Sequence, residues 1–97
     1  MWVGWIEFDL LLGAVGSLKE KRSLVRPLIA DLRRTYGVSA AEVDHLDLHR
    51  RAGVAIALVS SERNHLMEVL DSAERFVAAR PEFELLSARR SVRTSED

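Results

Sequence analysis

A continuous apolar run from Gly53 to Val59, with the sequence GVAIALV, constrains the fold of this chain more than any other feature. The run is too short for a stable helix, and its β-branched side chains favour a strand. A strand without polar positions belongs between other strands, because an edge strand leaves backbone groups and side chains open to water. We therefore predict a sheet with this segment near its centre.

Two other segments have the three- and four-residue apolar spacing of amphipathic helices. The first covers residues 18–36 and starts with a capping box, in which Ser17 precedes the helix and Glu20 lies in its first turn. Pro27 within it predicts either a kink or a regular helix that starts only near residue 23. The second helix is predicted to begin at a cap on Ser60 or Ser61 and to close before Pro81.

Period-two patterns complete the predicted sheet. Residues 2–12 alternate clearly, residues 38–48 alternate in part, and a last strand starts at Phe83. With right-handed crossovers, the order βαββαβ gives an α+β, ferredoxin-like fold: a four-stranded antiparallel sheet with both helices on one face and strands one and three in the middle. The 97 residues fit one domain, predicted over residues 1–93, with residues 94–97 as a disordered tail.

Composition narrows the function classes. The chain has no cysteine, which excludes disulfides, thiol nucleophiles and thiolate metal sites. Its 14 basic and 15 acidic side chains give a formal charge of −1, which argues against a polycation that coats nucleic acid. No apolar run approaches the roughly 20 residues of a membrane span, and no signal peptide is recognisable at the N-terminus. We expect a soluble, cytoplasmic protein without membrane association.

The sheet face that points away from the helices is predicted to be apolar at one end and acidic at the other. The apolar end comprises Val3, Trp5, Ala55, Ala57 and Val59, and the acidic end comprises Glu7, Asp9, Glu42 and Asp44. The third strand has no aromatic residue on which a base could stack, and carboxylates repel phosphates, so RNA binding on this face is disfavoured. The apolar end favours a homodimer or a small-ligand site, and a half-buried Trp5 in a monomer is the alternative.

The first predicted helix is locally basic. Residues 17–34 contain six cationic and two acidic side chains, a local charge of +4. Two glycines precede the helix N-terminus, whose free amides attract anions. We expect this side to contact RNA or another anionic partner through the following residues: Lys19, Lys21, Arg22, Arg26, Arg50 and Arg51. The alternative is a solvated helix face with ordinary capping.

Catalytic and metal sites are disfavoured. Residues 42–49 hold two histidines and three carboxylates, but alternation along a strand separates them, and their spacing matches no familiar metal site. We therefore predict no metal, no cofactor and no catalytic residue. Acylphosphatase, an enzyme of the same topology, needs an arginine in the loop after its first strand. It also needs an asparagine on a neighbouring strand. The corresponding loop here, residues 13–17, has no arginine, and the only asparagine, Asn64, lies at the start of the second predicted helix.

Two motifs, SLKEKR at residues 17–22 and AEVDHLDLHRRA at residues 41–52, are specific in combination. On these motifs the chain resembles the YlxP-like family, small bacterial proteins classed as a domain of unknown function. The resemblance spans residues 3–86 and departs from the family pattern at Pro27, at His49, where a tryptophan is expected, and at Arg50, where a glutamine is expected.

This resemblance implies a ferredoxin-like fold and brings no catalytic residue or cofactor. It also implies a gene neighbourhood of translation initiation factor two and ribosome-binding factor A. That neighbourhood points to ribosome assembly or translation initiation, with ribosomal RNA or a ribosomal protein as the expected partner.

Overall fold

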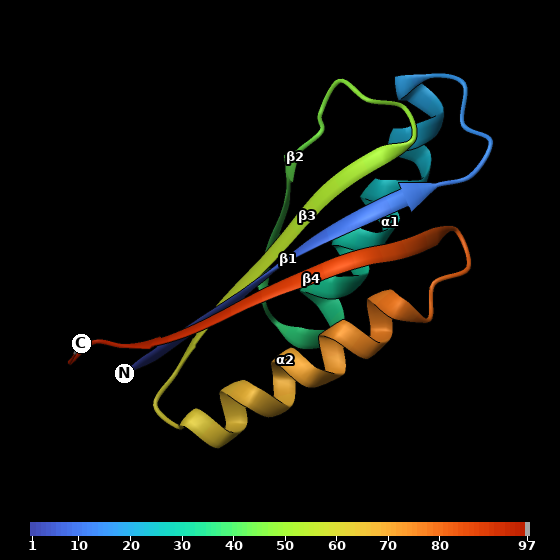
Figure 1. The fold of residues 1–97 in the computed structure, drawn as a ribbon. Coiled ribbons are helices and arrows are strands. Elements are labelled where there is room, and N and C mark those ends of the chain that lie inside the picture. The colour runs from blue at the N-terminus through green and yellow to red at the C-terminus, as the bar shows by residue number, and fades with distance from the viewer. Residues whose placement is uncertain (97) are drawn as a thin grey trace.

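A computed structural model describes residues 1–96 and shows a long, twisted sheet with two helices on one of its sides (Figure 1). The elements in chain order are β1 (Trp2–Leu12), α1 (Leu18–Tyr36), β2 (Ser39–Asp44), β3 (Arg51–Ser60), α2 (Arg63–Ala78) and β4 (Phe83–Thr94). All neighbouring strands are antiparallel, in the order β2-β3-β1-β4. The predicted topology and the central position of β1 and β3 are confirmed.

The core lies between the sheet and the helices. Alternation along β1 turns Ile6, Phe8, Leu10 and Leu12 toward the helices, where all four are buried. The helices supply the opposing side chains: Val25, Leu28 and Leu32 from α1, and Leu66, Leu70, Ala73 and Val77 from α2. Burial of these stripes drives helix docking, because apolar area removed from water stabilises by about 25 cal/mol per Å². The other side of the sheet, called the open face below, has no covering layer.

Helix α1 begins and ends where local sequence chemistry predicts. The Ser17 hydroxyl accepts a hydrogen bond from the Glu20 amide at 3.1 Å, and Gly37 adopts a left-handed conformation (φ 64°) that lets its amide bond to the Arg33 carbonyl. The helix is continuous through Pro27 and does not start near residue 23. Pro27 is exposed, so the carbonyl that its missing amide would have bonded can be hydrated.

The structure moves the predicted end of β2 and the predicted start of α2. Strand β2 ends at Asp44 rather than near Leu48, because the register with β3 shifts between Glu42 and Asp44 and His45 then takes a positive φ of 57°. The N-cap of α2 is Glu62 rather than Ser60 or Ser61, although the Ser60 hydroxyl accepts the Glu62 amide at 3.0 Å.

At the C-terminus, Thr94 belongs to β4, and the Ser95 amide bonds to the Met1 carbonyl at 2.9 Å. The disordered tail predicted from residue 94 is therefore wrong for these two residues, which pairing with the N-terminus holds in place. Asp97, the last residue of that predicted tail, lies outside the described residues. Among the described helices, none is long and apolar enough to cross a membrane.

Candidate binding surfaces

Lys21 is not available to an external anion, which corrects its predicted role. Its side chain is only 2% exposed, and its ammonium lies 2.7 Å from the Glu42 carboxylate and donates to the His45 carbonyl at 2.7 Å. Lys21 precedes Val25 by four residues and Leu28 by seven, so it belongs to the buried stripe of α1. This spacing in the sequence predicts a buried position for Lys21, whereas its positive charge alone predicts an exposed one.

Glu42 points toward the helices and not toward the open face, where it was predicted. It is paired with the buried Val54 on β3, and the register shift that follows it turns only Asp44 to the open face. The contact between Glu42 Oε2 and the Lys21 ammonium is an ion pair by distance but lacks the angles of a hydrogen bond. A buried ammonium and carboxylate at 2.7 Å still neutralise each other, so we treat Glu42 as the partner of Lys21.

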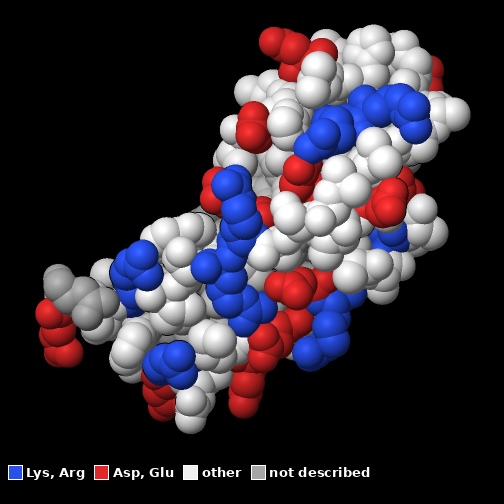
Figure 2. All heavy atoms as spheres, viewed as in Figure 1, with Lys and Arg blue, Asp and Glu red and all other residues white. Residues whose placement is uncertain are grey.

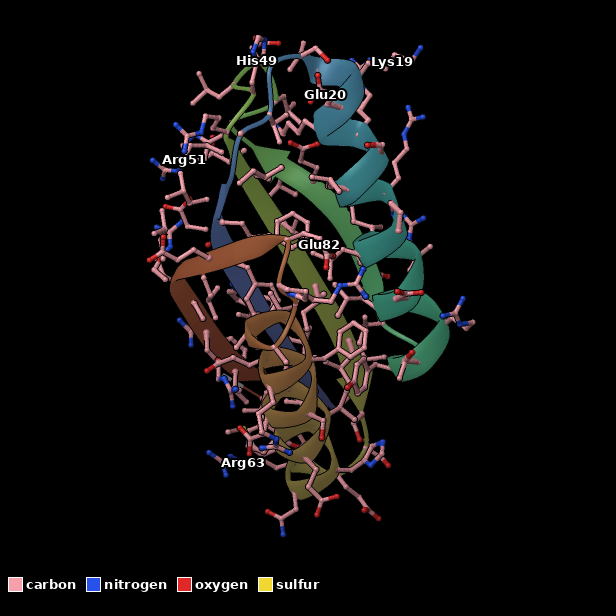
Figure 3. The ribbon with its side chains drawn as sticks, turned by 90° about the vertical axis from the view of Figure 1, so that its right-hand side faces the viewer. Lys19, Glu20, His49, Arg51, Arg63 and Glu82 are labelled. Carbon is pink, nitrogen blue, oxygen red and sulfur yellow. The ribbon has the colours of Figure 1, made fainter. Side chains whose placement is uncertain are left out.

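The two arginines of the β2–β3 loop lie in different places. The guanidinium of Arg50 donates to the Gly13 carbonyl at 2.9 Å and so fastens the β1–α1 loop, while the side chain stays exposed. Arg51 lies on the opposite side of the sheet from α1, as Figure 3 shows. The six residues predicted to form one basic patch are therefore not one surface.

Three cations remain on the outer side of α1. Lys19, Arg22 and Arg26 are exposed and border a shallow hollow of about 420 Å³ together with Ser23 and Pro27. None of the three has an ion pair or a hydrogen bond to another described side chain. We call Lys19, Arg22 and Arg26 the basic stripe.

The helix N-terminus beside this stripe is already capped. Glu20 turns back so that its carboxylate accepts the Gly16 amide at 3.4 Å, while its own amide bonds to Ser17. A carboxylate therefore occupies the position where an anion would approach the helix end, and it would repel that anion. Anion contact at this end of the molecule is left to the basic stripe and to the exposed part of Arg50.

On the open face, Arg51 and Asp9 are the centre of a polar cluster. Arg51 donates two hydrogen bonds to the Asp9 carboxylate, at 3.2 and 2.5 Å, and the His45 imidazole lies 3.7 Å from the same carboxylate. The bonds from Arg51 hold the pKa of Asp9 below its usual value, against the effect of partial burial, and the same contact raises the pKa of Arg51. Both groups stay charged at neutral pH.

Next to this cluster is a polar hollow of about 340 Å³. Its lining includes Glu7, Asp9, Asp44, His45 and Arg89. Arg89 lies 3.5 Å from Glu7; the Arg89 side chain is largely exposed and that of Glu7 partly so. Among residues 1–96, no three side chains of the metal-binding types converge to hold an ion.

The apolar end of the open face is assembled as predicted. Val3, Trp5, Ala55, Ala57 and Val59 share that face, and Trp5 lies directly beside Ala57 in the β1–β3 register. A second hollow of about 470 Å³, the apolar hollow, is lined by Trp5, Glu7 and Val43 together with small side chains of β2 and β3: Ser39, Ala41, Ala55 and Ala57. Seen from the sheet side, basic and acidic side chains are interleaved with uncharged surface (Figure 2).

The strand order and the two helices on one side define an α+β protein of the ferredoxin-like class. The sequence profile of the family described as "Protein of unknown function (DUF503)" matches residues 3–90, and the chain belongs to this family. A relative, "Uncharacterized protein YlxP" of Bacillus subtilis (strain 168), is 30% identical over 82 residues, which cover 84% of this chain and 89% of the relative. The resemblance to the YlxP-like family is thereby confirmed.

A solved structure also aligns with the chain. It is a variant of SnoaB, a cofactor-independent oxygenase from Streptomyces nogalater, with 12% identity, a TM-score of 0.49, and coverage of 99% of this chain and 94% of that one. A similarity of this size carries no argument about the chemistry of the present protein.

Proposed function

We propose that this protein is a non-enzymatic accessory factor of ribosome assembly or translation initiation that contacts RNA backbone through α1. The observation that carries the proposal is the basic stripe: three exposed cations on one helix face without a carboxylate partner among the described residues. The gene neighbourhood implied by the family resemblance supplies the biological setting.

The spacing of the three cations in the basic stripe fits contact with the phosphates of an RNA backbone. At 100° per residue, Lys19, Arg22 and Arg26 fall within about 60° of one another around the helix, and they span about 10 Å along its axis. Cations without internal partners can pair with phosphates at little cost, because no existing ion pair has to be broken. Their guanidinium and ammonium groups offer hydrogen-bond donors to phosphate oxygens, whereas the hydroxyl of Ser23 in the same hollow already donates to the Glu20 carbonyl.

The charge distribution makes this contact one-sided. On the open face, away from α1, cations and carboxylates lie side by side: Arg51 binds Asp9 and Arg89 lies 3.5 Å from Glu7, so these arginines are already paired, unlike those of the basic stripe. An RNA partner is therefore directed to the helix side, where the basic stripe and the exposed Arg50 are found. This arrangement would allow a chain with a net charge of only −1 to contact RNA from one side.

Co-sedimentation with purified ribosomal subunits and with isolated ribosomal RNA tests the proposal. Three phosphate contacts predict that affinity falls about 40-fold between roughly 50 and 200 mM salt. Replacing Lys19, Arg22 and Arg26 with alanine should abolish most of this binding and flatten its dependence on salt. The matched control removes three other exposed cations, Arg34, Arg63 and Arg75, and should bind nearly as the unaltered chain does.

Two outcomes would contradict the proposal. Absence of binding to subunits and to RNA at low salt would reject it, and so would equal losses in the stripe variant and the control variant. Binding to subunits but not to isolated RNA would identify a ribosomal protein as the partner and would reject the RNA contact.

A further inference from the structure

We propose that the open face is an interface with a second copy of this chain, in which Trp5 of each copy fills the apolar hollow of the other. The proposal is independent of RNA binding, since α1 lies on the other side of the sheet. It specifies the arrangement of the two copies and the residues that meet.

The open face carries both a large apolar side chain, the partly buried Trp5, and a hollow beside it. Trp5 is a large side chain whose neighbours across β3 and β2 are small: Ala57 is paired with Trp5 on one side and with Ser39 on the other. The Arg93 guanidinium lies over the Trp5 ring, 5.9 Å from its centroid, and the ring also lines the apolar hollow. A second indole is the kind of flat apolar group that fits over the alanines.

A two-fold axis that runs parallel to the strands and passes between β1 and β3 brings Trp5 of one copy to the apolar hollow of the other. It places β1 of one copy over β3 of the other, and thus each Trp5 over the partner copy's Ala57 and hollow. A two-fold interface must be self-complementary, and Trp5 and the hollow that would receive the partner copy's Trp5 lie on the same patch of this face. Sheets packed face to face in this way remain within about 30° of alignment.

The charged side chains of the open face favour this axis over a two-fold axis perpendicular to the strands. The same rotation places β4 over the partner copy's β2, which brings Arg89 near Asp44, at side chains that are 73% and 67% exposed. A two-fold axis perpendicular to the strands would instead place β4 over β4, so Arg89 and Arg93 of both copies would crowd together. Like charges in a dry interface are costly, and opposite charges fix the register.

The available area suffices for a modest dimer. Four strands about 4.8 Å apart and five side-chain rows about 6.8 Å apart give a footprint of roughly 600 Å². This is somewhat below the ~800 Å² per partner of a standard stable interface. We therefore expect association in the micromolar range.

Sedimentation velocity between about 1 and 100 μM tests the inference. The unaltered chain should shift from monomer to dimer across this range. Ala57→Arg places a charge in the hollow and should weaken association at least tenfold, whereas Ala78→Arg, at an exposed position on α2, should not. Val59→Arg, at a position already 65% exposed, provides a second variant that folding tolerates and should also weaken the dimer.

A charge exchange tests the axis itself. Arg89→Asp and Asp44→Arg should each weaken the dimer about tenfold, and the double variant should recover affinity to within about threefold of the unaltered chain. A strict monomer at 100 μM, or a dimer that Ala57→Arg and Val59→Arg leave unchanged, would overturn the proposed interface. Failure of the double variant to recover would overturn the proposed axis.

Discussion

Lys21 and His45 connect the two sides of the sheet. The Lys21 ammonium, buried on the helix side, donates to the His45 carbonyl at 2.7 Å, while the His45 imidazole lies on the open face, 3.7 Å from the Asp9 carboxylate. The positive φ of His45 allows its carbonyl and side chain to point to opposite sides. The end of β2 is therefore fixed from both faces, and the polar hollow depends on a lysine that no ligand can reach.

Replacing Lys21 with methionine should destabilise the protein by about 3 kcal/mol or more. Methionine fills similar space but leaves the Glu42 carboxylate, which is 17% exposed, without its partner, and breaking a buried pair from one side costs about this much. The His45 carbonyl also loses its donor. Urea denaturation at pH 7 measures the change in the free energy of unfolding.

The double variant Lys21→Met with Glu42→Leu separates the charge effect from packing. Removing both charges leaves no uncompensated carboxylate, so this variant should recover at least half of the lost stability. A double variant no more stable than Lys21→Met would show that the His45 contact, rather than the ion pair, is the main contribution.

Gly53 should not tolerate a side chain. A Cβ atom at this position would lie 2.6 Å from Asp44 Cβ and 3.2 Å from Asp44 Cα, so the end of β2 would have to move. We expect Gly53→Ala to cost about 1–3 kcal/mol, as overpacking does elsewhere. Gly13→Ala is the control, since nothing lies within 4 Å of its added Cβ, and it should change stability by less than about 0.5 kcal/mol. Thermal unfolding of both variants checks the difference.

The pKa of Asp31 should depend more strongly on Arg80 than on Arg34. Arg80 donates to its carboxylate at 2.8 Å and is the larger cause of its lowered pKa, while Arg34, whose side chain is 74% exposed, contributes less. Replacing Arg80 with alanine should therefore raise the pKa of Asp31 more than the same change at Arg34. An NMR titration of the Asp31 carboxyl compares them, and an equal rise in both variants would contradict this assignment.

Local patterns in the sequence predicted most of the fold. The alternation of β1, the serine cap of α1 and the glycine after Tyr36 act within a few residues, so their geometry is fixed by chain stereochemistry. Two element ends were predicted wrongly. Ser60 is the last residue of β3 and bonds to the Glu62 amide just before α2, and β2 ends at Asp44 because of a register shift that local alternation does not reveal.

The site was harder to predict, because its contacts depend on register. Simple alternation puts Glu42 and Asp44 on one face, and only the register shift between them separates the two carboxylates. The pairing of Asp9 with Arg51 joins positions 42 residues apart and follows from the alignment of β1 on β3. Lys21 is the exception. Its spacing from Val25 and Leu28 places it in the apolar stripe of α1, but its positive charge favoured an exposed position in the prediction.

The Asp9–Arg51 contact should make stability depend on acid pH. Because Arg51 holds the pKa of Asp9 below its ordinary value near 3.8, this contribution is fully present above about pH 4 and is lost as pH falls through the lowered pKa. Asp9→Asn should therefore reduce stability at pH 7, by about 1 kcal/mol or less for so exposed a pair, and the difference should shrink as the pH approaches 2. Asp47→Asn, which alters an exposed carboxylate without an ion pair among residues 1–96, is the control and should show no such dependence. Urea denaturation of the three proteins between pH 2 and 7 measures this, and a difference that grows on acidification would show that Asp9 opposes folding.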